Sequence, residues 1–129
     1  MIPIILILII IILWICWTIF NRMRVKQFAR FITEEEFKQG SRRAQIIDLR
    51  EKNDFNAGHI LGARNLPYST MKTFYSNIRK DLPVYLYDQG SNISTRTAIF
   101  LHKNGFNDIS ILKNGYRNWN GKTKKSATY

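Results

Sequence analysis

The chain has 129 residues, which is enough for one compact domain and an appendage but too few for two domains with separate cores. Lysine and arginine number 20 and aspartate and glutamate 9, so the formal net charge is +11. The single cysteine, Cys16, excludes a disulfide within the chain and fits a reducing compartment.

The N-terminal segment from Ile2 to Phe20 is apolar and has no ionisable side chain except the thiol of Cys16. About nineteen residues rising about 1.5 Å each form a helix of roughly 28 Å, close to the thickness of the hydrocarbon core of a bilayer. We therefore predict that residues 1–20 are a transmembrane anchor.

Two other kinds of N-terminal segment fit this sequence less well. A cleaved secretory signal needs a charged start and small residues at the cleavage site, whereas Met1-Ile2-Pro3 has no charged side chain and Trp14 and Trp17 are large. A lipoprotein signal needs a small residue before the modified cysteine, and here Ile15 precedes Cys16. Both departures favour a retained anchor.

Basic residues follow the anchor directly: Arg22, Arg24, Lys26 and Arg30. Positive charge beside a span marks its cytoplasmic side. We therefore predict a single-pass protein of the cell membrane, with a basic linker at residues 21–30 and the C-terminal domain in the cytoplasm. An anionic lipid surface would attract this domain by about 1 kcal/mol per basic residue. Nucleic acid would attract it too, but the chain has no nucleic-acid motif, so we expect no nucleic acid to bind.

The rest of the chain alternates between strand and helix patterns. The first helix begins with Thr33-Glu34-Glu35-Glu36, which has the spacing of a capping box. The predicted helices cover residues 33–39, 54–58, 69–78, 94–104 and 116–119. The predicted strands cover residues 45–49, 65–67, 83–87 and 109–112, and a frayed basic tail is expected at residues 122–129.

Such alternation predicts an α/β domain with a mainly parallel sheet and helices on its faces. In this architecture ligands bind beyond the carboxyl ends of the strands. The polar loop after Tyr87, which contains Gly90, is therefore the candidate site.

Several segments resemble the signature of rhodanese-like domains. They are Asp48-Leu49-Arg50, Phe55, the run from Gly58 to Pro67, and Leu112 to Tyr116 with Trp119. The resemblance covers residues 31–121 and implies a rhodanese-like α/β domain. It also implies thiosulfate or persulfide sulfur transfer, in which a cysteine directly after the strand at residues 84–87 carries the sulfur and an arginine five residues later completes the loop.

The sequence departs from that pattern at both positions. In the register without gaps, Asp88 stands at the position of the family's cysteine and Ile93 at that of its arginine. A shifted register brings Arg96 near the arginine position, but the spacing to Gly105 then fails. Because a carboxylate cannot take up sulfane sulfur and Cys16 lies in the predicted anchor, we expect no catalysis by this mechanism. The degenerate loop comprises Asp88, Gln89, Gly90, Ser91, Asn92 and Ile93.

Asp88 has three interpretations: it caps the helix that follows the loop, binds a metal, or acts as a carboxylate nucleophile. The loop supplies no second carboxylate, which favours capping, and we expect neither a metal nor a cofactor. Donors for a small anion at the start of that helix are predicted to be Ser91, Asn92, Ser94 and Thr95. Structural roles are assigned to Asp48, Arg50, His59 and Gly62, with Asp48 and Arg50 as an ion pair and His59 ordering a turn.

Two functional hypotheses follow. The first is a membrane-anchored, non-catalytic rhodanese-like module that binds a protein partner or a small anion at the cytoplasmic face. The second is a sulfurtransferase of the same family, which would need a cysteine from a partner or another reaction at Asp88.

Overall fold

The computed structural model describes residues 1–25 and 29–125 of the chain. The α-helices are α1 (Ile2–Val25), α2 (Glu34–Gly40), α3 (Lys52–Ala57), α4 (Met71–Phe74) and α5 (Asn92–Lys103). The strands are β1 (Ala29–Ile32), β2 (Gln45–Asp48), β3 (His59–Ile60), β4 (Arg64–Asn65), β5 (Val84–Tyr87), β6 (Ile109–Leu112) and β7 (Thr123–Lys124). Three short 3-10 turns are η1 (Tyr68–Thr70), η2 (Tyr75–Asn77) and η3 (Tyr116–Asn118).

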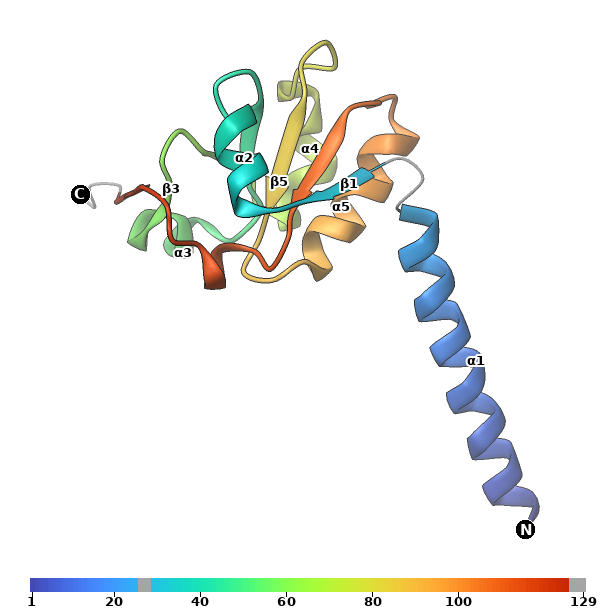
Figure 1. The fold of residues 1–129 in the computed structure, drawn as a ribbon. Helices are drawn as coiled ribbons and strands as arrows, with labels where there is room; N and C mark the ends of the chain where they lie inside the picture. The colour runs from blue at the N-terminus through green and yellow to red at the C-terminus, as the bar shows by residue number, and fades with distance from the viewer. Residues whose placement is uncertain (26–28, 126–129) are drawn as a thin grey trace.

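Five strands form one parallel sheet in the order β1-β6-β5-β2-β4. Successive residues of β5 point to opposite faces, because side chains alternate along a strand. Val84 and Leu86 pack with Ala98 and Leu101 of α5 on one face, and Tyr87 packs with Phe37 of α2 on the other. This is the predicted α/β architecture, a mainly parallel sheet covered by helices, and the prediction is confirmed (Figure 1).

The capping box predicted before the first helix of the domain is present. The Thr33 hydroxyl accepts from the Glu36 N–H at 3.3 Å, and the Glu36 carboxylate accepts from the Thr33 N–H at 3.2 Å. These bonds satisfy amides that the first turn leaves free. Phe37, which is wholly buried, then fixes α2 against the sheet.

The N-terminal helix α1 projects away from the domain beside β1 and α5 (Figure 1). Its segment Ile2–Asn21 has a mean hydropathy of 3.0, and none of it is buried inside the protein. By length and composition α1 can therefore cross a membrane, a property that signal sequences share.

Helix and strand both extend into residues 21–30, the predicted basic linker. Helix α1 continues past the apolar segment to Val25, because the basic residues there are good helix formers. Strand β1 begins at Ala29, inside the predicted linker, and pairs with β6 along the edge of the sheet. Its four residues carry no strand pattern of their own, so only the pairing reveals it.

Three other predicted segments, at residues 69–78, 116–119 and 122–129, differ from the structure. The helix predicted at residues 69–78 is broken into η1, α4 and η2. Met71 and Ile78 are buried in the core and Tyr75 packs against it, whereas Phe74 is 45% exposed. The predicted terminal helix is the single turn η3. The predicted frayed tail begins with β7, which pairs antiparallel with β3, and its residues 126–129 lie outside the described residues.

Candidate functional site

The candidate site is the loop that follows β5 at the carboxyl edge of the sheet. Its backbone carbonyls are held by η3: Tyr116 N–H donates to the Asp88 carbonyl at 2.9 Å, and Arg117 N–H donates to the Gln89 carbonyl at 3.1 Å. This approach requires Gly115, whose φ is +64°, because a Cβ there would lie 2.6 Å from the Gln89 carbonyl oxygen. The backbone of the loop is thus held in place by hydrogen bonds from η3.

The Asp88 side chain folds back onto the start of α5. It is 5% exposed, and its Oδ1 accepts hydrogen bonds from the Ser94 N–H at 3.3 Å and from the Ser94 hydroxyl. Ser94 is the third residue of α5, so the carboxylate occupies a free amide of the first turn, where negative charge is favoured. Of the three interpretations of Asp88, this geometry matches helix capping.

Of the four predicted anion donors, Ser91, Asn92 and Thr95 line one pocket beside the start of α5, and Ser94 does not. Ser94 is wholly buried, and both its N–H and its hydroxyl are used by Asp88. The Thr95 hydroxyl donates to the Ser91 carbonyl at 2.8 Å, and Asn92 is exposed. A small anion in this cradle would meet the Asp88 carboxylate, which holds the donors that the anion needs.

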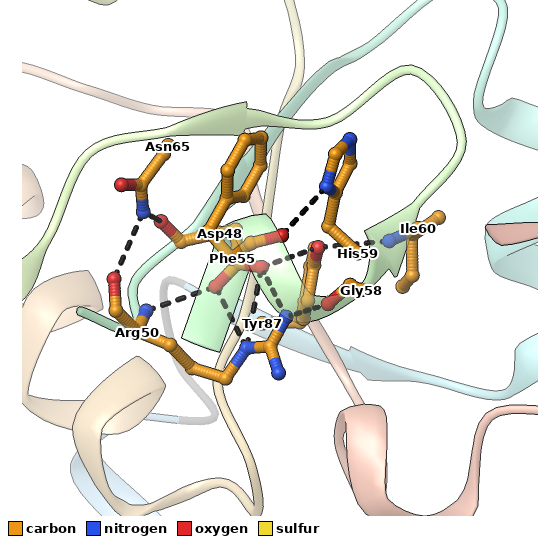
Figure 2. Close-up of polar contacts among 8 residues, drawn as sticks. All are labelled: Asp48, Arg50, Phe55, Gly58, His59, Ile60, Asn65 and Tyr87. Carbon is orange, nitrogen blue, oxygen red and sulfur yellow. Dashed lines mark hydrogen bonds and ion pairs between the residues drawn. The ribbon is translucent and has the colours of Figure 1, made fainter. Parts of the chain in front are cut away.

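A buried polar network lies beside the loop (Figure 2). Arg50 Nη2 lies 2.7 Å from Asp48 Oδ2, with side chains 7% and 0% exposed. The same guanidinium donates to the Gly58 carbonyl at 2.6 Å, and the Tyr87 hydroxyl donates to Asp48 Oδ2 at 2.7 Å. The network therefore joins the end of β2, the end of α3 and the last residue of β5.

Two pKa values reflect this arrangement. Burial opposes the charge of Arg50, but the hydrogen bond and charge of Asp48 outweigh it and raise the pKa of Arg50. Burial, followed by the charge of Asp48, raises the pKa of Tyr87 well above its usual range. Arg50 is therefore charged and Tyr87 neutral at any physiological pH.

The remaining residues of the predicted motif hold the turn after α3. His59 is 4% exposed, its Nδ1 lies 2.8 Å from the Phe55 carbonyl oxygen, and its ring stacks on that of Phe55 at 3.7 Å between centroids. Gly62 has a φ of +90°, which an L side chain rarely adopts. In the described part of the chain, His59 contacts Phe55 and the space beside Gly62 is bounded by Ile46, so neither residue belongs to the loop after β5.

Sequence reasoning missed two tyrosines that link the network to the loop. The Tyr87 hydroxyl also accepts from the Ile60 N–H at 3.1 Å, although the sequence shows Tyr87 only as a strand residue. The Tyr116 ring lies under the Arg50 guanidinium, 4.1 Å from its Cζ, while the Tyr116 N–H bonds to Asp88. Tyr87 could have been noticed because it is the last residue of the strand before the loop. No feature of the sequence indicated a role for Tyr116.

Within residues 1–25 and 29–125, no group of three histidine, cysteine or acidic side chains is arranged to hold a metal ion. The one thiol of the chain, Cys16, is exposed on α1 and not in the loop.

Comparison with known proteins shows which family has this fold and motif. Residues 33–122 match the model of the rhodanese-like domain. The chain is 48% identical to the "Uncharacterized protein YqhL" of Bacillus subtilis over 118 residues, covering 92% of this chain and 94% of that protein. It is 33% identical to "Thiosulfate sulfurtransferase GlpE" of Pseudomonas putida over 76 residues, covering 59% of this chain and 69% of the relative.

Solved structures show the same fold. The crystal structure of a rhodanese-like domain protein from Staphylococcus aureus superposes with a TM-score of 0.69 at 22% identity, covering 76% of this chain and 99% of that one. The domain predicted at residues 31–121 and the matched residues 33–122 nearly coincide.

Proposed function

The chain belongs to the rhodanese-like domain family, and on that premise we propose that it is a non-catalytic module, anchored in the cell membrane by α1, that binds a protein partner at the cytoplasmic face. The observation that carries this proposal is the Asp88 carboxylate. It sits where the family resemblance places the sulfur-carrying cysteine, and it bonds to the start of α5.

The chemistry of sulfur transfer explains why this position decides the matter. A thiolate attacks the sulfane sulfur of thiosulfate, the sulfur–sulfur bond breaks, and sulfite leaves with the electron pair. The resulting persulfide then gives its outer sulfur to cyanide as thiocyanate. The Asp88 carboxylate has no sulfur atom with which to form a persulfide, and its negative charge repels both thiosulfate and cyanide. A partner protein thus suits this loop better than a small anion does.

The anchor and the charge distribution support the membrane part of the proposal. The apolar segment Ile2–Asn21 is long enough to span. The basic residues that follow it favour a cytoplasmic domain and attraction to anionic lipid. Protease protection in sealed vesicles tests the orientation: the domain should be digested from the cytoplasmic side alone.

The second candidate is thiosulfate sulfurtransferase activity, which the printed name of the Pseudomonas putida relative favours. It requires a thiol from another source, because Cys16 is on α1. Both candidates predict that the native loop alone does not transfer sulfur, but only the second predicts sulfur transfer when another protein supplies a thiol.

The test is thiosulfate-to-cyanide sulfur transfer by the full chain in micelles, with Cys16→Ser in every variant. We expect no thiocyanate from the native loop, and activity together with one added sulfur atom by mass spectrometry after Asp88→Cys with Ile93→Arg. Asp54→Cys, an exposed acidic position on α3, is the matched control for adding a thiol elsewhere and should stay silent. Turnover by the native loop would refute the non-catalytic proposal.

A further inference from the structure

A pocket lies where the anchor meets the domain. It encloses about 560 Å³ between the last turns of α1, the first turns of α5 and the turn that follows β6. Thr18 and Asn21 line it from α1, Asn92 and Arg96 from α5, and Lys113 from the turn. We call it the junction pocket. It lies on the outer side of α5, and Asp88 does not line it.

The junction pocket is positively charged. Arg96 and Lys113 are exposed, and neither takes part in the ion pairs formed by residues 1–25 and 29–125. Among the described residues, no acidic side chain lines the pocket. Phe31 and Ile99 give it apolar walls beside the polar ones. Such a site suits a ligand with a negative group and a hydrocarbon part.

The position of the pocket along α1 identifies that ligand. Thr18 and Asn21 stand at the domain end of the apolar segment Ile2–Asn21, so a helix that spans a bilayer brings them to the headgroup layer. Figure 1 shows α1 running from this junction away from the domain. The residues of α1 that precede Thr18 are mostly exposed apolar ones.

We propose that the junction pocket binds one anionic phospholipid of the surrounding leaflet. Arg96 and Lys113 contact the headgroup phosphate, and the acyl chains lie along α1. Because the described lining residues include no carboxylate that could pair with an ammonium group, a net-negative headgroup is preferred to a zwitterionic one. This inference rests on the proposed membrane anchoring and adds a specific lipid site to it.

The test titrates the full chain in zwitterionic micelles with short-chain phosphatidylglycerol and, separately, with short-chain phosphatidylcholine. Binding is followed by the amide shifts of Asn92, Arg96 and Lys113 in NMR spectra. Glycerol 3-phosphate and inorganic phosphate form the free-anion arm. We expect saturable shifts with phosphatidylglycerol and little change with the other three probes.

Charge variants separate this pocket from general attraction. The double variant Arg96→Gln with Lys113→Gln should bind phosphatidylglycerol on the order of 30-fold more weakly, since two basic residues near a lipid surface together contribute about 2 kcal/mol. Lys72→Gln with Lys103→Gln removes two exposed lysines elsewhere on the domain and should bind as the native chain does; neither lysine forms an ion pair within residues 1–25 and 29–125.

Three results would overturn the proposal: equal binding of phosphatidylcholine, equal weakening in both double variants, or binding of the free anions as tight as that of the lipid. The titration does not depend on which side of a membrane the domain occupies. A domain protected from protease on the cytoplasmic side would therefore refute the proposed function, whereas a failed titration would refute the lipid site alone.

Discussion

Replacing Arg50 with methionine tests the buried network in one step. Methionine keeps an unbranched apolar side chain over the Tyr116 ring but removes the guanidinium that pairs with Asp48. Removing one partner of a buried ion pair costs about 3 to 5 kcal/mol, because the other charge is left without compensation. Asp48, which is 0% exposed, has no access to water that could replace it.

The structure places the expected cost near the lower end of that range. Without the guanidinium, Asp48 still accepts from the Arg50 N–H at 2.9 Å and from the Tyr87 hydroxyl at 2.7 Å. The Gly58 carbonyl loses its donor, however. We therefore expect a loss of about 3 kcal/mol in the free energy of unfolding, which corresponds to roughly 100-fold faster hydrogen exchange of β5 amides.

The assay is hydrogen exchange with mass spectrometry on the full chain in micelles, read at the peptide that contains β5. Arg79→Met is the matched control, because Arg79 forms a similar close ion pair with Asp81 whose side chains are both 64% exposed. This variant should leave exchange of β5 nearly unchanged. Adding Asp48→Asn to Arg50→Met removes the stranded charge and should recover part of the loss. Equal protection in the two single variants would refute the role given to the buried pair.

Three further predictions concern single positions. Because burial and the charge of Asp48 raise the pKa of Tyr87, the unfolded tyrosine loses its proton near pH 10 while the folded one keeps it. Its stabilising contribution is therefore complete below about pH 10 and is lost above it, by up to about 1.4 kcal/mol per pH unit. Denaturation at pH 9 and pH 11 should show this slope, and Tyr87→Phe should reduce it. Gly115→Ala should destabilise the domain by about 2 kcal/mol or more, since φ is +64° and the new Cβ meets loop carbonyls; Gly90→Ala, which meets open space, is the thermal-melt control. Thr33→Ala should cost about 1 kcal/mol through loss of the capping box, measured by the same melts.

The sequence predicted the sheet and the long elements because their signals are local. Residues 84–87 and 109–112 are short, mainly apolar segments whose side chains pack on both faces of the sheet, and the hydrogen bonds of the capping box lie within one turn. The motif from Asp48 to Pro67 pointed to the right family for the same reason, since its residues are close in the chain.

What could not be predicted depends on contacts across the chain. Strand β1 exists because it pairs with β6, some eighty residues later, and β7 because it pairs with β3. The hydrogen bonds from Ser94 to Asp88 depend on the direction in which α5 starts after the loop. The sequence does not give this direction, so Ser94 was predicted to be a free donor. The ring of Tyr116 reaches Arg50 only after the chain has returned past the loop.

The connection between α1 and β1 has a consequence for the choice of partners. Helix α1 ends at Val25 and β1 begins at Ala29, so three residues join them. Even fully extended, such a joint reaches only about 14 Å. With α1 in a membrane, the domain would diffuse in the plane of the membrane and stay within a layer at the membrane surface that is little thicker than the domain. Proteins held in that layer meet it at a far higher effective concentration than freely diffusing ones, and crowding on the membrane surface would set the rate of their encounter.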